Sequence, residues 1–158
     1  MKLKTLEELN AIVRVAKEEG KRIVFANGCF DVLHVGHIRY LRDAKQQGDV
    51  LIVGLNNDAS VRRLKGEGRP ILDQESRAIL LEALEDVDYI QIFPDDTVDR
   101  LLLELKPHVH AKGSDYSIES VPERETVKSY GGSTSITGGE KLQSTRWLFE
   151  EIKRRYSR

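Results

Sequence analysis

Hydrophobic and polar positions follow two periods along the chain, one typical of buried strands and one typical of helices. Short apolar or β-branched runs predict strands at residues 23–26, 50–55, 89–93, around 109, and at 133–137. Between these runs, apolar residues recur every three or four positions, which predicts helices that bury one face each. Regular alternation of strand and helix indicates a parallel, doubly wound α/β sheet with right-handed crossovers.

The first predicted helix precedes the first strand. Thr5 and Glu8 fit a capping box, in which each side chain satisfies a backbone N–H at the start of the helix. Its expected apolar face consists of Leu6, Leu9, Ile12, Val13 and Ala16. We expect residues 1–20 to form a packing or partner element, residues 22–137 the α/β core and residues 144–156 a last helix, all within one domain.

Two further segments complete this outline. Glycines and a proline among charged residues predict a loop at 65–70. Asp73 can cap the helix that follows. The face of that helix expected to point into the core consists of Ile79, Leu80, Ala83 and Leu84.

Composition restricts the class of protein. At 158 residues and 18.0 kDa the chain is most simply a single domain. Its 25 basic and 26 acidic residues give a net charge of -1, so no broad attraction for nucleic acid or a membrane surface is expected. A single cysteine excludes an internal disulfide framework and a cysteine-based zinc site. With no apolar stretch near the ~20 residues of a membrane span, we expect a cytoplasmic protein.

The chemical signal is concentrated in residues 22–41, which predict a strand, a glycine turn and a helix. His34 and His37 lie one turn apart at the start of that helix, with Gly36 between them. Such a loop lies at the carboxyl end of a strand, where helix N–H groups favour anions, and two imidazoles add donors for a phosphoryl group. A bare pair of this kind also occurs on ordinary surfaces, and a zinc site would need a third ligand, for which Asp31 is the nearby candidate.

The whole phrase Asn27-Gly-Cys-Phe-Asp31, followed by His34-Val-Gly-His37, resembles the nucleotidyltransferase family of cytidylyltransferases and small adenylyltransferases. The resemblance covers nearly the whole chain. Later residues follow in the order that the family uses, namely Lys65, Arg69-Pro70, Arg77, Lys112-Gly-x-Asp115-Tyr116 and Ser144-Thr145. Together they look most like the branch that joins ATP to D-glycero-β-D-manno-heptose 1-phosphate. The resemblance implies a Rossmann-like domain with a five-stranded, mainly parallel sheet.

The resemblance also implies a role for each matched residue. The expected catalytic residues are His34, His37, Lys65 and Lys112. The expected nucleotide contacts are Asn27, Gly28, Cys29, Phe30, Gly36, His37, Arg77, Gly113, Asp115, Gln143, Ser144 and Thr145. The expected contacts of the second substrate are Asp31, Asn56, Arg69 and Tyr116, and Asp31 is also the candidate ligand for the Mg²⁺ that accompanies ATP.

Several alternatives stay open at the level of sequence. Arg77 fits a structural ion pair as well as a phosphate contact, and Asp31 could simply cap its turn. Gln143 stands where the family usually has a hydroxyl. Glycerol 3-phosphate cytidylyltransferase and FAD synthetase share the histidine motif, and a non-catalytic nucleotide-binding protein is a further alternative. ATP and a small phosphorylated substrate are the expected partners, with a homodimer as the expected assembly and no nucleic acid or membrane.

Overall fold

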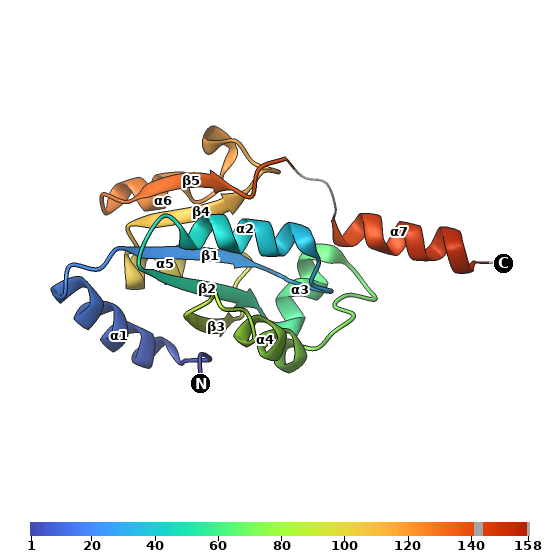
Figure 1. The fold of residues 1–158 in the computed structure, drawn as a ribbon, viewed down its shortest axis with the longest axis horizontal. Helices are drawn as coiled ribbons and strands as arrows, with labels where there is room; N and C mark the ends of the chain where they lie inside the picture. Colours follow the sequence, from blue (N-terminus) through green and yellow to red (C-terminus); the bar gives the residue numbers. More distant parts are fainter. Residues whose placement is uncertain (141–143, 158) are drawn as a thin grey trace.

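One parallel sheet runs through the molecule, as Figure 1 shows for this computed structural model. The structure describes residues 1–140 and 144–157. Within them the sheet has the order β3-β2-β1-β4-β5. The strands are β1 (Ile23–Gly28), β2 (Val50–Asn56), β3 (Tyr89–Phe93), β4 (Val109–Gly113) and β5 (Ser133–Thr137). All neighbouring strands are parallel, which confirms the predicted doubly wound α/β fold.

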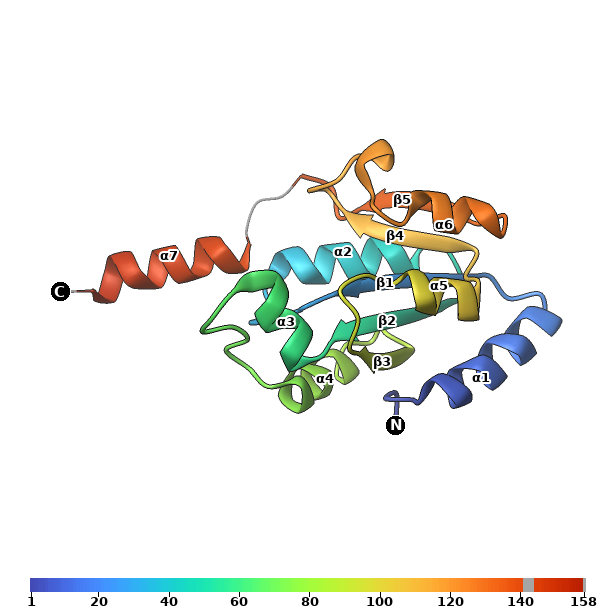
Figure 2. The ribbon, with the colours of Figure 1, turned by 180° about the vertical axis from the view of Figure 1, so that it is seen from behind.

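Helices cover both faces of the sheet (Figures 1 and 2). On one face, α2 (Val35–Lys45) and α4 (Gln74–Glu82) pack on Val24 and other inward residues of the strands. On the opposite face lie α1 (Leu6–Glu18), α5 (Asp99–Leu105) and α6 (Arg124–Ser129). Alternate residues of β1 point to the two sides, so that Val24 joins one core cluster and Phe25 the other. This arrangement leaves the carboxyl ends of the strands for a ligand.

The N-terminal segment is attached to both the sheet and its own helix. The Lys4 N–H donates to the Ile90 carbonyl over 2.9 Å, and the Ile90 N–H donates to the Lys2 carbonyl over 2.9 Å. The predicted capping box is present, because the Glu8 N–H donates to Thr5 Oγ1 (3.1 Å) and the Thr5 N–H to Glu8 Oε2 (2.8 Å). The predicted inward face of α1 is also confirmed at its centre, where the buried residues are Leu9, Val13 and Ala16.

The predicted inward face of α4 is wrong except at Leu84, which packs against the core. Ile79 is 66% exposed and Leu80 is 41% exposed, whereas Ala78 and Leu81 are buried. The buried face of α4 includes Arg77, whose side chain is fully buried. Hydrophobicity alone predicts that an arginine points to solvent, so it assigns the wrong face of the helix to the core. The apolar pattern could not reveal an arginine used as a core residue.

Two shorter elements and a final helix lie around the ligand end of the sheet. The helix α3 (Asp58–Lys65) follows β2, and a 3-10 helix (Ile118–Ser120) follows β4. In both Figure 1 and Figure 2, α7 (Thr145–Tyr156) extends away from the sheet, and it contains no buried residue. Among the helices of the described chain, none has the length and apolar character needed to cross a membrane.

Candidate active site

A cleft of about 810 Å³ opens at the carboxyl ends of the strands. It lies where β1 is flanked by β2 on one side and β4 on the other, which is the topological switch point of such sheets. Many of the residues singled out from the sequence line it: Asn27, Gly28, Cys29, Phe30, Asp31, His34, Gly36, His37, Asn56, Lys65, Arg69, Lys112, Gly113, Asp115, Tyr116, Ser144 and Thr145. Gln143 lies outside the described residues, and Arg77 does not line the cleft.

Both histidines of the motif cap the helix that they begin. His34 is the N-cap residue of α2, and its Nδ1 accepts a hydrogen bond from the Gly36 N–H over 3.1 Å. The His34 N–H in turn donates to Nδ1 of His37 over 3.2 Å. Because each Nδ1 accepts a backbone hydrogen bond, each neutral ring carries its proton on Nε2. The two rings therefore present N–H donors at the cleft.

The turn before the histidines is backbone-strained. Phe30 has a φ of 49° and Val32 a φ of 58°, a left-handed conformation that is rare for a β-branched residue. The Phe30 ring lies 5.3 Å from the His37 ring, and the His34 and His37 rings are 3.8 Å apart between centroids. The strained turn thus packs an aromatic ring against the histidine pair and fixes its position.

Asn27, at the end of β1, is held by two residues that sequence reasoning did not single out. His110 Nε2 lies 2.8 Å from Asn27 Oδ1, and Tyr40 Oη accepts from the Asn27 N–H over 3.3 Å while donating to the Ala111 carbonyl over 2.6 Å. Burial lowers the pKa of His110 to about 3, so the ring is neutral and its Nε2–H donates to the Asn27 side chain. The Asn27 amide is therefore held in one orientation at the cleft.

Signals for these two residues were present in the sequence. Tyr40 falls three positions after His37, on the same side of the helix. His110 is a titratable residue within a short apolar strand. Their partners, however, come from distant parts of the chain, and only the folded arrangement identifies them.

Asp31 holds the cleft together instead of facing a metal. Its carboxylate accepts three hydrogen bonds, from Arg69 Nε (2.9 Å), the Ile71 N–H (2.9 Å) and the Leu72 N–H (3.0 Å), and the residue is 1% exposed. Thr145 Oγ1 also donates to the Asp31 carbonyl over 2.9 Å. The role of Asp31 as a Mg²⁺ ligand is therefore corrected, since its oxygens already serve three donors. Arg69 is likewise engaged by this ion pair.

No cluster of three or more His, Cys, Asp or Glu residues suited to a metal ion occurs within residues 1–140 and 144–157. The described side chains of the cleft do not form a magnesium cage. Mg²⁺ commonly binds mainly through substrate phosphates and water, with few protein ligands. Binding of the ion as part of a metal–nucleotide complex is consistent with the residues of the cleft.

Arg77 is a structural residue, which corrects its assignment as a nucleotide contact. Its Nη1 donates to the Cys29 carbonyl (2.6 Å) and to the Asn56 carbonyl (2.8 Å), and its Nη2 pairs with Asp58 (2.7 Å). Its Nε donates to the Leu72 carbonyl over 3.0 Å. Since the side chain is 0% exposed, no bound nucleotide can reach it, and its function is to join the ends of β1 and β2.

Asn56 is similarly occupied beneath the cleft. The residue is 4% exposed, and its Nδ2 donates to Ser60 Oγ over 3.2 Å and to the Asp95 carbonyl over 3.4 Å. Its side chain therefore braces the start of α3, although the residue lines the cleft.

Two lysines supply positive charge to the cleft. Lys65 is exposed at the end of α3, and Gly66 (φ 98°) and Gly68 (φ 87°) follow it in a left-handed turn that favours glycine. Lys112 is only 8% exposed at the end of β4, and its Nζ lies 4.6 Å from the centroid of the Tyr116 ring. Burial lowers the pKa of Lys112, while the Glu123 carboxylate opposes this effect.

The thiol of Cys29 lies within the electrostatic field of these cations. Burial raises its pKa, and the charges of Lys65 and Arg77 act in the opposite direction. A thiol with a raised pKa is a poor nucleophile, which is consistent with Cys29 being a small residue of the turn.

The start of α7 lies at the same cleft. Ser144 is its N-cap residue, and its Oγ accepts from the Trp147 N–H over 3.0 Å. The Arg69 guanidinium lies 4.7 Å from the centroid of the Phe149 ring. Together with the bond from Thr145 to Asp31, this contact joins α7 to the turn after β1.

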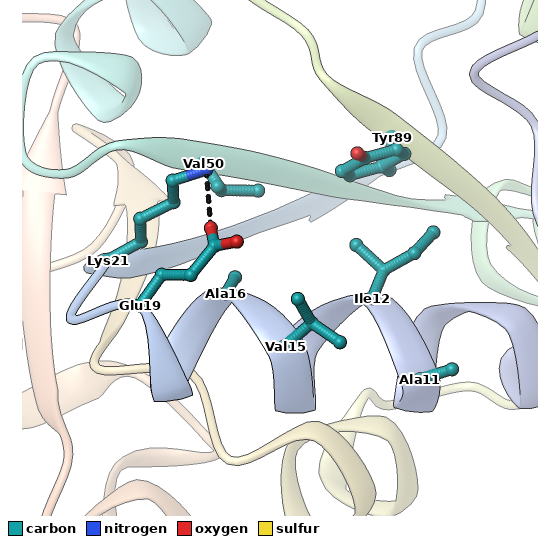
Figure 3. Close-up of a pocket in the computed structure, with 8 residues that line it drawn as sticks. All are labelled: Ala11, Ile12, Val15, Ala16, Glu19, Lys21, Val50 and Tyr89. Carbon is teal, nitrogen blue, oxygen red and sulfur yellow. Dashed lines mark ion pairs between the residues drawn. The ribbon is translucent and has the colours of Figure 1, made fainter.

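A second hollow of about 440 Å³ lies between α1 and the sheet, as Figure 3 shows. Its lining residues are Ala11, Ile12, Val15, Ala16, Glu19, Lys21, Val50 and Tyr89. Val50 and Tyr89 begin their strands, so this hollow lies at the edge of the sheet opposite the cleft. The charged residues of this hollow are Lys21 and Glu19, which form an ion pair of 2.8 Å with each other. Because Lys21 is paired in this way, the hollow is not suited to a phosphate.

The parallel sheet, with paired histidines capping the helix after its first strand, defines a nucleotidyltransferase. The family model described as Cytidylyltransferase-like matches residues 25–155, and the chain belongs to this family. It is 49% identical over 156 residues to the Bifunctional protein HldE of Pelobacter propionicus and 50% identical over 155 residues to that of Geobacter metallireducens. These matches cover 99% and 98% of this chain but 32% of each relative, so the chain spans about a third of their length.

A solved structure shows the same fold. The lipopolysaccharide core biosynthesis protein from Thermoplasma volcanium superposes with a TM-score of 0.67 at 28% identity. The match covers 78% of this chain and 100% of that one. The family and fold expected from the histidine motif are therefore confirmed.

Proposed function

We propose that the protein transfers the adenylyl group of ATP to D-glycero-β-D-manno-heptose 1-phosphate, giving ADP-heptose and pyrophosphate. The observation that carries the proposal is the histidine pair, in which both Nδ1 atoms accept backbone N–H groups and both rings line the cleft. The choice of substrates is supported by the sequence motifs and by the relatives named HldE. The lipopolysaccharide core biosynthesis protein of similar fold supports the same choice.

In this reaction an oxygen of the sugar phosphate attacks the α-phosphorus of ATP in line. The new bond joins that oxygen to the α-phosphorus, and the bond from the α-phosphorus to the bridging oxygen breaks as pyrophosphate leaves. A phosphate monoester is largely dianionic near neutral pH, so the nucleophile needs no general base. The task of the protein is therefore to position the reactants and to stabilise charge.

The imidazole Nε2–H groups of His34 and His37 donate to the oxygens on which charge develops. Lys65 and Lys112 add positive charge from opposite sides of the switch point, since they end α3 and lie in β4. Mg²⁺ bound to the triphosphate supplies further charge neutralisation. The positive end of the α7 dipole, beside Ser144 and Thr145, favours a phosphate there.

The remaining expectations form part of the same proposal. We expect residues 1–158 to act as one nucleotidyltransferase domain, to work in the cytoplasm and to form a homodimer. Gel filtration with light scattering tests the assembly, and a mass near 18.0 kDa would contradict the dimer.

The decisive experiment measures magnesium-dependent pyrophosphate release with ATP or CTP paired with heptose 1-phosphate, glycerol 3-phosphate or FMN. Release with ATP and heptose 1-phosphate alone is the expected result. Release with CTP and glycerol 3-phosphate, or with ATP and FMN, would overturn the choice of substrates. Nucleotide binding without release in any pairing would overturn catalysis itself.

A further inference from the structure

Glu123 is a buried acid whose carboxylate has no part in the catalytic scheme. It is 4% exposed, it lines the cleft just before α6, and its Oε2 has no hydrogen-bond partner in the described part of the chain. Buried polar atoms are nearly always paired, because leaving one unpaired costs free energy. An unpaired carboxylate oxygen at the wall of a cleft therefore indicates a group that a ligand completes.

The surroundings of Glu123 define what kind of ligand this is. Lys112 and Tyr116 line the same cleft, and the Glu123 carboxylate partly opposes the lowering of the Lys112 pKa by burial. Lys112 nevertheless forms no ion pair with it among the described residues, and its Nζ lies instead over the Tyr116 ring at 4.6 Å. The cleft thus holds a buried cation and a buried carboxylate that form no ion pair with each other in the described part of the chain.

We propose that Glu123 recognises the hydroxyl groups of the acceptor sugar phosphate, while Lys112 binds its phosphate. This inference rests on the proposed function. An ionised carboxylate only accepts hydrogen bonds, sugar hydroxyls donate them, and a phosphate is repelled by the same charge. A sugar 1-phosphate carries its phosphate next to a ring of hydroxyls, which matches a cation placed beside an acceptor.

A nucleobase amine is the competing donor for Glu123. In a nucleotide, however, the ribose separates the base from the α-phosphate. A base amine bound to Glu123 would therefore leave the α-phosphate away from Lys112. The sugar phosphate satisfies both groups at once. A site built to bond a hydroxyl also rejects analogues that lack it, because the buried acceptor is then left unpaired.

The test compares Glu123→Gln with Glu125→Gln, an exposed glutamate on α6 that pairs with Arg124. In steady-state assays with ATP and heptose 1-phosphate, Glu123→Gln should raise KM for the sugar phosphate by about tenfold to a hundredfold, because a charged acceptor is replaced by a neutral amide that also carries a donor. KM for ATP should stay within about twofold, since no ATP bond is removed. Glu125→Gln should change neither constant.

A rise in KM for ATP instead would overturn the proposal and assign Glu123 to the nucleotide. Unchanged constants in a folded variant would overturn it as well. If Glu123→Gln does not fold by circular dichroism, Glu123→Asp keeps the charge at a shorter reach, and it should raise KM for the sugar phosphate selectively. Unchanged constants for that variant contradict the proposal.

Calorimetry separates this inference from the proposed function. Heptose 1-phosphate is titrated into wild type and Glu123→Gln in the presence of a non-hydrolysable ATP analogue. No binding to wild type would refute the proposed substrate and the inference with it. Equal binding to both proteins would leave the proposed function standing and refute the role of Glu123.

Discussion

The His34 backbone N–H donates a hydrogen bond to Nδ1 of His37 over 3.2 Å, so the second histidine of the motif caps the helix that the first one begins. The two ring nitrogens of His37 thus have different roles, one in the fold and one in the proposed reaction. Nδ1 satisfies an N–H at the start of α2, and Nε2 is the donor that the proposed function assigns to a phosphoryl oxygen. Stability and turnover can therefore be separated by substitution at this one position.

His37→Ala should lower kcat by about 10²–10³, as for removal of one donor to a transition-state oxyanion. It should also lower the free energy of unfolding by about 0.5–2 kcal/mol because the cap is lost. His37→Asn keeps an acceptor near Nδ1 but removes the Nε2 donor, so it should lose turnover and retain more stability. Val35→Ala, an exposed residue on the same turn, serves as the control. Near-normal kcat in a folded His37→Asn protein would contradict the donor role.

Asp31 should be essential for stability and not for magnesium binding. Asp31→Ala removes the acceptor of Arg69 and of two backbone N–H groups, and breaking such a buried pair costs about 3–5 kcal/mol. Urea unfolding measures this loss. Glu19→Ala, which breaks an exposed pair with Lys21, should cost no more than about 1 kcal/mol.

Activity assays over a range of Mg²⁺ concentrations complete this test in the less destabilising Asp31→Asn variant. The concentration giving half-maximal rate should stay within about twofold of wild type, because no metal ligand is removed. A tenfold increase, on the order expected when a site loses a charged ligand, would restore Asp31 as a ligand.

Arg77 should act through the fold alone. Arg77→Met leaves the Asp58 carboxylate and the Cys29 and Asn56 carbonyls without their donor, and we expect a loss of about 3–5 kcal/mol in unfolding free energy. Arg77→Lys keeps the charge and should lose less. KM for ATP in the folded lysine variant should remain within about twofold, because the side chain makes no nucleotide contact. A selective rise in this KM at unchanged stability would show that a nucleotide reaches the site.

His110 should make the protein less stable in acid. Its pKa is about 3 in the folded state against 6.5 as its ordinary value, so both states are neutral above pH 6.5. Below that pH the unfolded chain binds a proton that the folded chain does not, and the free energy of unfolding falls by up to about 1.4 kcal/mol per pH unit.

The comparison of wild type with His110→Asn isolates this contribution. Chemical unfolding near pH 7.5 and near pH 5 should show a smaller loss of stability for the variant, by about 2 kcal/mol over the interval below the ordinary histidine pKa. Parallel stability curves for the two proteins would mean that the folded state accepts the proton. The variant also removes the ring that orients Asn27, so its kcat is measured at the higher pH alone.

The features predicted from sequence are those that depend on neighbouring residues. The capping box of Thr5 and Glu8, the α/β alternation and the motif from Asn27 to His37 are local, and each is found in the structure. The misassigned residues are polar side chains with distant partners. Asp31 bonds residues 69, 71 and 72, and Arg77 bonds residues 29 and 56, so their burial depends on how loops meet at the end of the sheet.

The bonds between Ile90 and the N-terminal segment also decide which side of the sheet is open to other chains. Lys2 and Lys4 occupy backbone groups on the outer side of β3, and their charged side chains discourage a further strand there. The opposite edge is β5, whose sequence Ser133-Thr-Ser-Ile-Thr137 is mostly polar. The two edges of the sheet are therefore protected against edge-to-edge aggregation in different ways. The N-terminal segment covers β3, and the polar side chains of β5 disfavour pairing with another chain.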